Sequence, residues 1–174
     1  INIKLINKDR SLPLSSGALY KFMKRIIDFT GSIIGLIILS PLFIAVSLLI
    51  KLEDPKGPVF FKQKRVGING NEFHMYKFRS MVTNAEEKLN ELLKYNEASG
   101  AMFKIKEHPR ITRIGKIIRK RSVDELPQLI NVLKRDMSLV GPRPPLLREV
   151  EEYTNYDKQR LLVTPGCTGV WQVS

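Results

Sequence analysis

The sequence is poor in the residues that bind metals or cross-link small folds. Its 174 residues include one cysteine, two histidines and one tryptophan. A single cysteine, Cys167, excludes an internal disulfide, which fits a reducing cytosol. With only His74 and His108 to accompany Cys167, the chain lacks the ligand set of a Cys/His zinc site. Internal repeats and low-complexity segments are absent as well.

Negative charge is also scarce. The chain has 29 lysines and arginines against 17 aspartates and glutamates, which gives a net charge of +12 and a pI of about 9.9. Such a balance predicts an anionic partner, which could be nucleic acid, an anionic lipid or a phosphorylated substrate. The length allows one domain with a sizeable core and an attached element.

One apolar segment dominates the rest. The 22 residues from Phe29 to Ile50 contain no charge, and a straight helix of that length would be about 33 Å long, enough to cross a bilayer. The pair Ser40-Pro41 lies at the middle of this segment, and lysines and arginines flank both ends. Because positive charge marks the cytoplasmic side, both ends are expected on that side.

Three structures are compatible with this segment: a helix–break–helix hairpin that re-enters the same face, a kinked spanning helix, and a buried core helix. We favour the hairpin, because Pro41 removes a backbone hydrogen bond. The Ser40 hydroxyl could satisfy the group that is freed. Lys24 and Arg25 precede the segment at helical spacing and are expected to contact lipid phosphates, unless they are simply solvated.

A β-hairpin is predicted after the apolar segment. Residues 59–66 and 73–78 alternate in polarity around Asn69-Gly70, a strong turn signal. The second strand leads into Lys77 and Arg79, two cations that could hold a phosphate or form a charged outer face of the sheet. A helix with one apolar face follows over 85–93, and then a loop with His108, which we interpret as incidental.

The adjacent carboxylates Asp124 and Glu125 are the strongest catalytic candidates. They follow a basic helical stretch that ends at Arg121, whose cations could attract a substrate phosphate, and they precede an apolar helix that runs to Leu133. Ser122 and Glu125 could instead form a capping box. A carboxylate among cations at a helix start should have a lowered pKa, which suits a nucleophile or a Mg²⁺ ligand.

A proline-rich loop follows this helix. Gly141-Pro142-Arg143-Pro144-Pro145 should be extended and rigid, so that Arg143 loses little freedom on binding. Residues 149–160 look helical. The predicted fold class is α+β and mostly helical, with a re-entrant membrane helix, a small β-hairpin and amphipathic interfacial helices. We expect a linker over 1–19, the membrane hairpin over 20–51 and a C-terminally truncated catalytic domain over 52–174.

The order of four motifs resembles the bacterial sugar transferases, the monotopic polyprenyl-phosphate phosphoglycosyl transferases. The motifs are KRIIDFTGSIIGLIILSP, GPVFFKQKRVGINGNEFHMYKFRSM, TRIGKIIRKRSVDELPQLINVLKRDMSLVGPRPP and TPGCTGVWQVS. They cover nearly the whole chain from Tyr20. The sequence departs from the family at Arg135, where glycine is usual, and at Cys167, where an aliphatic residue is usual.

The resemblance implies an enzyme that moves a phosphosugar from a UDP-sugar to a polyprenyl phosphate and releases UMP. It implies that Asp124 forms a covalent intermediate, that Glu125 positions Mg²⁺ or handles protons, and that Arg143 holds a phosphate. Lys77, Arg79 and Arg121 would line the same pocket. The resemblance places the protein on the cytoplasmic face of the bacterial inner membrane, among membrane lipids and without nucleic acid. The identity of the sugar stays open, as does a homodimer.

Two other classes of function remain at this point. Residues 111–133 could form a membrane-tethered helix-turn-helix that binds nucleic acid, although the second helix is mostly apolar and opens with two acids. A membrane-surface scaffold without activity is the other.

Overall fold

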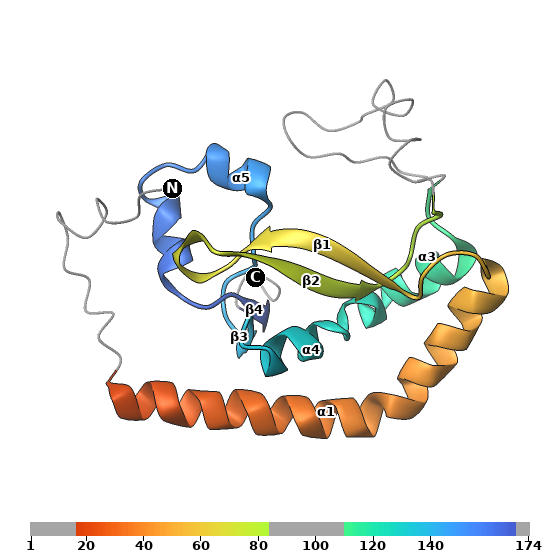
Figure 1. Ribbon diagram of the computed structural model, residues 1–174, viewed down its shortest axis with the longest axis horizontal. Helices are drawn as coiled ribbons and strands as arrows, with labels where there is room; N and C mark the ends of the chain where they lie inside the picture. Colours follow the sequence, from red (N-terminus) through yellow and green to blue (C-terminus); the bar gives the residue numbers. More distant parts are fainter. Residues whose placement is uncertain (1–16, 84–109, 170–174) are drawn as a thin grey trace. The chain divides into compact units, whose positions relative to one another are not determined.

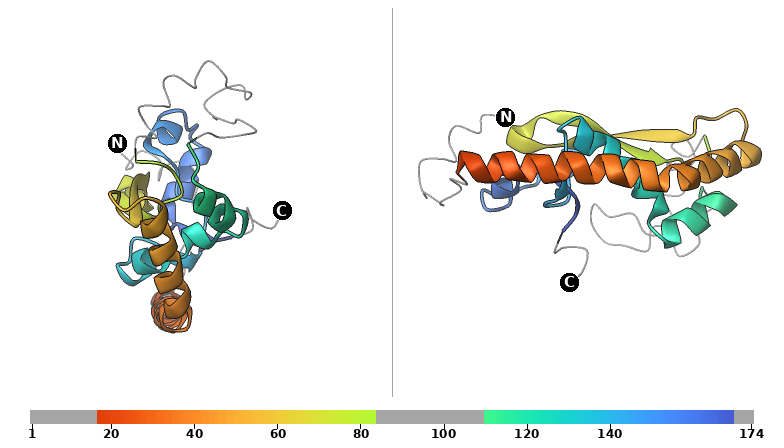
Figure 2. Two further views of the ribbon diagram at one scale, coloured as in Figure 1. Left: turned by 90° about the vertical axis from the view of Figure 1, so that its right-hand side faces the viewer. Right: turned by 90° about the horizontal axis from the view of Figure 1, so that it is seen from below.

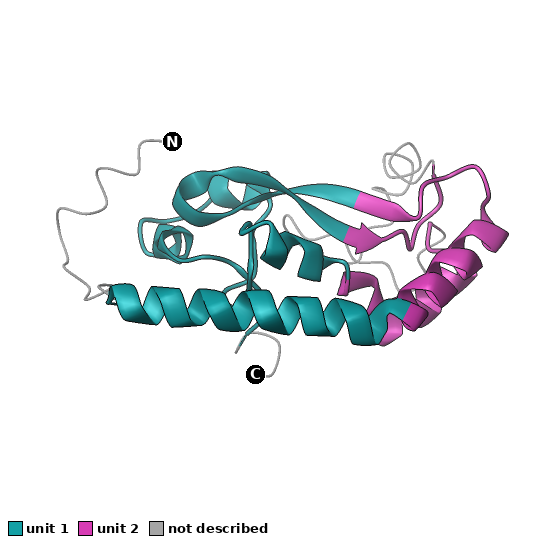
Figure 3. Cartoon of the chain, turned by 60° about the horizontal axis from the view of Figure 1, so that its bottom comes forward, with its two compact units in different colours: residues 1–40, 62–76, 127–174 teal, residues 41–61, 77–126 magenta. Residues whose placement is uncertain are grey.

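The computed structural model describes residues 17–83 and 110–169, which divide between two compact units (Figure 3). Unit 1 comprises described residues 17–40, 62–76 and 127–169, and unit 2 comprises 41–61, 77–83 and 110–126. The helix expected over 85–93, the loop with His108 and most of the expected linker lie outside the described residues.

Helix α1, Ala18–Glu53, contains the whole apolar segment and runs through Pro41 without interruption (Figures 1 and 2). The helix is thus not interrupted at Ser40-Pro41. Proline at position 41 cannot donate to the carbonyl of Ile37, but the Ser40 hydroxyl donates to that oxygen at 2.7 Å. Because the freed acceptor is satisfied locally, the helix continues, as the serine was expected to allow. The re-entrant course stays a prediction.

The predicted β-hairpin is confirmed. Strands β1 (Phe60–Val66) and β2 (Glu72–Phe78) pair in a two-stranded antiparallel sheet (Figure 1). A short 3₁₀ turn, η2 (Ile68–Gly70), joins them, and Asn69 and Gly70 there have φ of 57° and 80°. These positive φ values explain the Asn-Gly signal, since both residues tolerate the left-handed region.

The core of unit 2 is apolar and lies against the second half of α1. Val46 and Ile50 of α1 pack with Phe78 and with Ile118 of helix α3 (Arg113–Lys120). The predicted basic helix is thus confirmed, with Ile114 and Ile118 facing the core and Ile117 left 58% exposed. Its interfacial role is a prediction.

Unit 1 is built from shorter elements around two small cores. These shorter elements are helix α4 (Gln128–Leu133), strand β3 (Ser138–Val140), helix α5 (Leu147–Glu151), the 3₁₀ helix η5 (Asp157–Leu162) and strand β4 (Gly166–Thr168). Strands β3 and β4 pair in parallel. The cores are Val66, Val150 and Leu161, and Met75, Val132 and Met137.

Two predicted helices are shorter than expected. The helix expected to run from Asp124 or Glu125 to Leu133 is divided into a 3₁₀ turn, η4 (Val123–Glu125), and α4, which begins after Pro127. The capping box is also wrong, because Ser122 is left-handed, with φ of 53°, and its side chain makes no cap hydrogen bond. The polar stretch 149–160 is α5 and part of η5, not one helix.

Candidate active site

The acidic pair lies on the 3₁₀ turn η4 of unit 2, directly after α3. The left-handed Ser122 reverses the chain at the end of α3, and the amide of Glu125 then donates to the Ser122 carbonyl at 3.2 Å. The turn buries Asp124, which is 8% exposed, while Glu125 stays half-buried. The two neighbouring carboxylates therefore have different environments, which favours different roles.

Lys77 completes this group. Alternation along β2 sends Phe78 into the core of unit 2 and Lys77 to the opposite face. There the Lys77 ammonium donates to Glu125 Oε1 at 2.6 Å, with both side chains partly exposed. Of the residues predicted for the site, the structure thus brings together Asp124, Glu125 and Lys77.

The pKa of Asp124 is raised above its ordinary value of 3.8, and burial is the main cause. The charge of Lys77 lowers this pKa in part, Glu125 raises it further, and Arg119 lowers it. The expected direction is therefore wrong, because burial outweighs the cations. The carboxylate of Asp124 is poorly solvated, and an unsolvated anion is a stronger nucleophile once it is ionised.

Arg79 is also in unit 2, but its contacts lie with the end of α1. Its Nη1 donates to Asp54 Oδ2 at 2.6 Å and its Nη2 to the Asp54 carbonyl at 2.9 Å. Gly57 makes room for this guanidinium, since a Cβ at position 57 would overlap it. The phosphate-binding role of Arg79 stays a prediction, and the contact observed is with a carboxylate.

The neighbouring Glu53 fixes the start of α3. Its carboxylate accepts from the amides of Arg113 at 2.7 Å and Ile114 at 3.1 Å, and the Thr112 hydroxyl accepts from Gly115 at 2.9 Å. Helix α3 ends immediately before η4. Glu53, the last residue of α1, and Asp54, which follows it, therefore support the helix that leads into the acidic pair and Arg79, respectively.

Arg143 belongs to unit 1 and projects from a tightly held loop. The Pro142 carbonyl accepts from Gly166, the Pro144 carbonyl from Arg65 Nη1 at 3.0 Å, and the Pro145 carbonyl from Val66. The Arg143 side chain is 45% exposed and donates through Nη1 to both oxygens of Glu149, at 3.3 Å each. The predicted rigidity has a second source beyond the prolines, namely these backbone contacts.

The remaining predicted cation, Arg121, is exposed at the C-cap of α3. For metal binding, residues 17–83 and 110–169 contain no cluster of three or more His, Cys, Asp and Glu side chains. The acidic pair supplies two carboxylates. Mg²⁺ is usually held by one or two carboxylates together with substrate phosphates, so the pair fits Mg²⁺ shared with a substrate.

A model of the bacterial sugar transferase family matches residues 19–174. The chain belongs to this family. A galactosyl transferase CpsE of Streptococcus agalactiae is 52% identical over 151 residues, which cover 87% of this chain and 33% of that protein. An undecaprenyl-phosphate galactose phosphotransferase of Salmonella typhimurium is 50% identical over 158 residues, with 88% and 33% covered.

Another relative is covered more fully. The exopolysaccharide production protein ExoY of Sinorhizobium fredii is 40% identical over 170 residues, which cover 94% of this chain and 75% of that protein. In contrast, the chain spans about a third of the length of the CpsE and Salmonella relatives.

Sequence reasoning missed the acids at the ends of the apolar segment. Glu53 and Asp54 support α3 and Arg79 in unit 2, and Asp28 is buried in unit 1. The signal was available, because acids directly beside a long apolar run are costly unless they have partners.

Proposed function

We propose that this chain transfers a sugar 1-phosphate from a UDP-sugar to undecaprenyl phosphate and releases UMP, as the first membrane step in the synthesis of a surface glycan. Family membership supports the class of reaction. The observation that carries the assignment is the buried carboxylate of Asp124, next to Glu125 and Lys77.

The first half of the reaction uses the carboxylate of Asp124 as nucleophile. One of its oxygens attacks the β-phosphorus of the UDP-sugar and forms a phosphorus–oxygen bond. The bond between that phosphorus and the bridging oxygen breaks, and UMP leaves with the electron pair. The product is a sugar-phosphoryl aspartate, and the Lys77 ammonium offsets negative charge close to the reacting group.

The second half returns the enzyme to its starting state. A phosphate oxygen of undecaprenyl phosphate attacks the same phosphorus, and the bond to Asp124 breaks with its electrons returning to the carboxylate. UMP can leave before the lipid binds, so one phosphate-binding region can serve both halves. Mg²⁺ held by Asp124 and Glu125 would neutralise phosphate charge, and Arg143, Arg79 and Arg121 stay predicted phosphate ligands.

The test of this proposal is the covalent adduct. The membrane-inserted chain is incubated with Mg²⁺ and UDP-sugar labelled in the β-phosphate, with UDP-galactose and UDP-N-acetylgalactosamine as donors, and then separated under denaturing conditions. We expect label on the wild type and none on Asp124→Asn. Glu72→Gln, at an exposed position on β2, is the control and should keep the label. Label that persists on Asp124→Asn would refute Asp124 as the nucleophile.

The membrane arrangement is part of the proposal. Helix α1 is long and apolar enough to cross a bilayer, and large apolar side chains such as Ile37, Ile38 and Leu52 are 67–79% exposed on it. An exposed apolar surface of this kind indicates contact with lipid. We propose that α1 enters and leaves on the cytoplasmic face, which puts the catalytic residues on the side where nucleotide sugars are available.

Accessibility of single cysteines distinguishes this course from a crossing. In a Cys167→Ala background, cysteines are placed at Lys21 and at Lys56, and a membrane-impermeant thiol reagent is added to intact and to opened cells. Both positions should react only after opening. Reaction of one of them in intact cells would show that α1 spans the membrane.

The alternative of a nucleic-acid reader finds no support in α4. This helix has six residues, and its polar side chains Gln128 and Asn131 are buried. The Asn131 amide donates to the His74 carbonyl at 2.7 Å and its oxygen accepts from Tyr76 at 3.0 Å, so it holds the hairpin of unit 1.

A further inference from the structure

We propose that Asp28, together with Ser138, is a positioning residue that fixes the loop of Arg143 to helix α1, and so sets Arg143 for a substrate phosphate. The inference rests on the proposed function and extends it to a residue that does not contact substrate. All contacts that carry it lie within unit 1.

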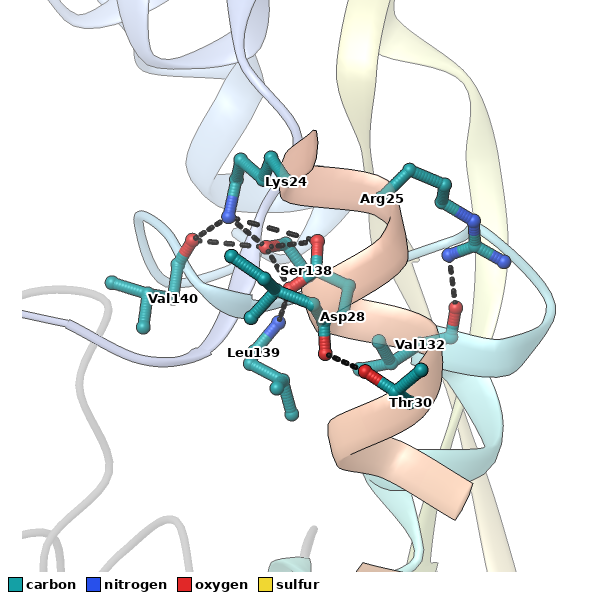
Figure 4. Close-up of polar contacts among 9 residues, drawn as sticks. Lys24, Arg25, Asp28, Thr30, Val132, Ser138, Leu139 and Val140 are labelled. Atoms are coloured by element: carbon teal, nitrogen blue, oxygen red, sulfur yellow. Dashed lines mark hydrogen bonds and ion pairs between the residues drawn. The ribbon is translucent and has the colours of Figure 1, made fainter. Parts of the chain in front are cut away.

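The carboxylate of Asp28 is buried against strand β3 (Figure 4). It accepts hydrogen bonds from the Ser138 hydroxyl at 2.8 Å and from the Leu139 amide at 3.0 Å. The Lys24 ammonium, one turn earlier in α1, lies 3.6 Å from Asp28 Oδ2 and donates to the Ser138 hydroxyl and the Val140 carbonyl. Lys24, which was expected to contact lipid, thus has partners inside the protein.

Burial of the Asp28 carboxylate beside an apolar segment is energetically costly, which points to a specific role. Asp28 immediately precedes the uncharged run 29–50, where an unpartnered charge would be costly. Apolar packing alone would hold the helix without such a group. Hydrogen bonds differ from apolar contacts in being directional, so the Asp28 contacts fix the position of β3 along α1.

The segment that connects strand β3 to Arg143 is short, and hydrogen bonds hold its backbone. The Gly141 amide donates to the Thr168 carbonyl, and the Pro144 carbonyl accepts from Arg65. Only four residues separate Leu139, held by Asp28, from Pro144, and one of them is Pro142. A shift of β3 would therefore move the backbone that carries Arg143.

A second contact of α1 provides an internal control. The Arg25 guanidinium donates to the carbonyl of Val132 at 2.7 Å (Figure 4), and also to that of Leu133 at 3.0 Å, at the end of α4. Removal of Arg25 loosens α1 from α4 and removes no contact with β3. A comparison of Asp28→Ala with Arg25→Ala therefore separates loss of docking from loss of loop position.

The two half-reactions are measured separately in membrane-inserted protein. Adduct formation is followed at varied UDP-galactose or UDP-N-acetylgalactosamine, and discharge of the isolated adduct at varied undecaprenyl phosphate. We expect Asp28→Ala and Ser138→Ala to raise the half-saturating concentration in one half-reaction about tenfold or more, with a smaller change in maximal rate. The half-reaction affected identifies the phosphate that Arg143 serves, that of the donor or that of the lipid.

Three further variants make the result decisive. Arg25→Ala, with a comparable loss of thermal stability, should leave both half-saturating concentrations unchanged. Asp28→Asn keeps an acceptor for Leu139 and should recover part of the loss. Arg143→Ala in the Asp28→Ala background should raise the half-saturating concentration little further, because the two residues act through one loop.

The outcomes distinguish this inference from the proposed function. A wild type that forms no adduct and releases no UMP refutes the proposed function itself. A wild type that turns over, with Asp28→Ala indistinguishable from Arg25→Ala or additive with Arg143→Ala, overturns the positioning role alone.

Discussion

The first half of α1 is held in unit 1 mainly by polar contacts, whereas the second half is held in unit 2 mainly by apolar packing. In unit 1 the polar contacts of α1 come from Lys24, Arg25 and the buried Asp28. Gly31 and Gly35 leave room for Leu139 and Leu129. In unit 2 the buried residues are Val46 and Ile50, which pack on Phe78.

The difference indicates that the two halves of α1 contribute differently, one mainly to position and the other mainly to stability. Apolar burial contributes most of the stability but tolerates small displacements, whereas a buried hydrogen-bonded carboxylate contributes less and fixes position. We therefore expect changes in the second half to appear mainly as loss of folding, and changes in the first half mainly as loss of substrate affinity. The predictions below test this division, beginning with the largest effect.

Phe78→Ala should have the largest effect on stability. Phe78 is 1% exposed and its ring lies 5.1 Å from that of Phe43 and 5.3 Å from that of Phe60. Truncation of such a residue costs about 3–5 kcal/mol. Thermal unfolding followed by tryptic cleavage in unit 2 measures the loss, and a change below about 1 kcal/mol would contradict the apolar account of this half.

Under the proposed mechanism, Lys77→Ala should slow adduct formation, on the order of a hundredfold, through loss of a charge beside Asp124, the proposed nucleophile. It should also move the acid limb of the pH profile to higher pH. The pKa of Asp124 is raised by burial and lowered by Lys77, so removal of Lys77 raises the pKa further, and a higher pH is needed to ionise the nucleophile. An acid limb that stays in place would show that Lys77 does not act on the pKa of Asp124.

Ser40→Ala should destabilise the junction between the two halves of α1 by about 1–3 kcal/mol, because the Ile37 carbonyl loses its donor. The double variant Ser40→Ala, Pro41→Ala should be more stable than the single one, since alanine at position 41 supplies a backbone donor. It should also straighten the helix toward a spanning course and reduce activity. Proteolysis, cysteine labelling and turnover measure the three effects, and equal stability of both variants would exclude the role given to Ser40.

Glu72→Gln should have the smallest effect. It removes an ion pair with Lys64 in which the two side chains are 50% and 63% exposed, and such pairs contribute about 0–1 kcal/mol. Measured beside Asp28→Ala, this variant tests whether burial, and not charge as such, makes a polar contact important. A loss of stability as large as that of Asp28→Ala would show that exposed and buried polar contacts do not differ in this protein.

Local patterns in the sequence predicted the elements whose signals are local. The β-hairpin follows from alternation around Asn69-Gly70, and α3 from the spacing of Ile114 and Ile118. The acidic pair was also apparent, because neighbouring carboxylates among cations stand out in a basic chain. In each case the deciding interactions involve residues close together in sequence.

Two features that the sequence did not predict depend on contacts between residues that are distant in sequence. The direction of the Asp124 pKa shift depends on burial, and the role of Asp28 depends on Ser138, which lies 110 residues away. Continuation of α1 through Pro41 depends on one side-chain hydrogen bond, from the Ser40 hydroxyl to the Ile37 carbonyl. The start of η4 likewise depends on a left-handed Ser122, which no sequence pattern predicts.

The pairing of Arg143 with Glu149 has a consequence for inhibitor chemistry. Glu149 is itself held by the Leu146 amide at 2.8 Å, so its carboxylate stands beside the guanidinium as a built-in anion. The distances of 3.3 Å are long for a charge-assisted bond, and a better acceptor should displace it. A nucleoside that carries a flat carboxylate in place of its diphosphate would imitate a contact the protein already makes, with less charge to hinder entry into cells.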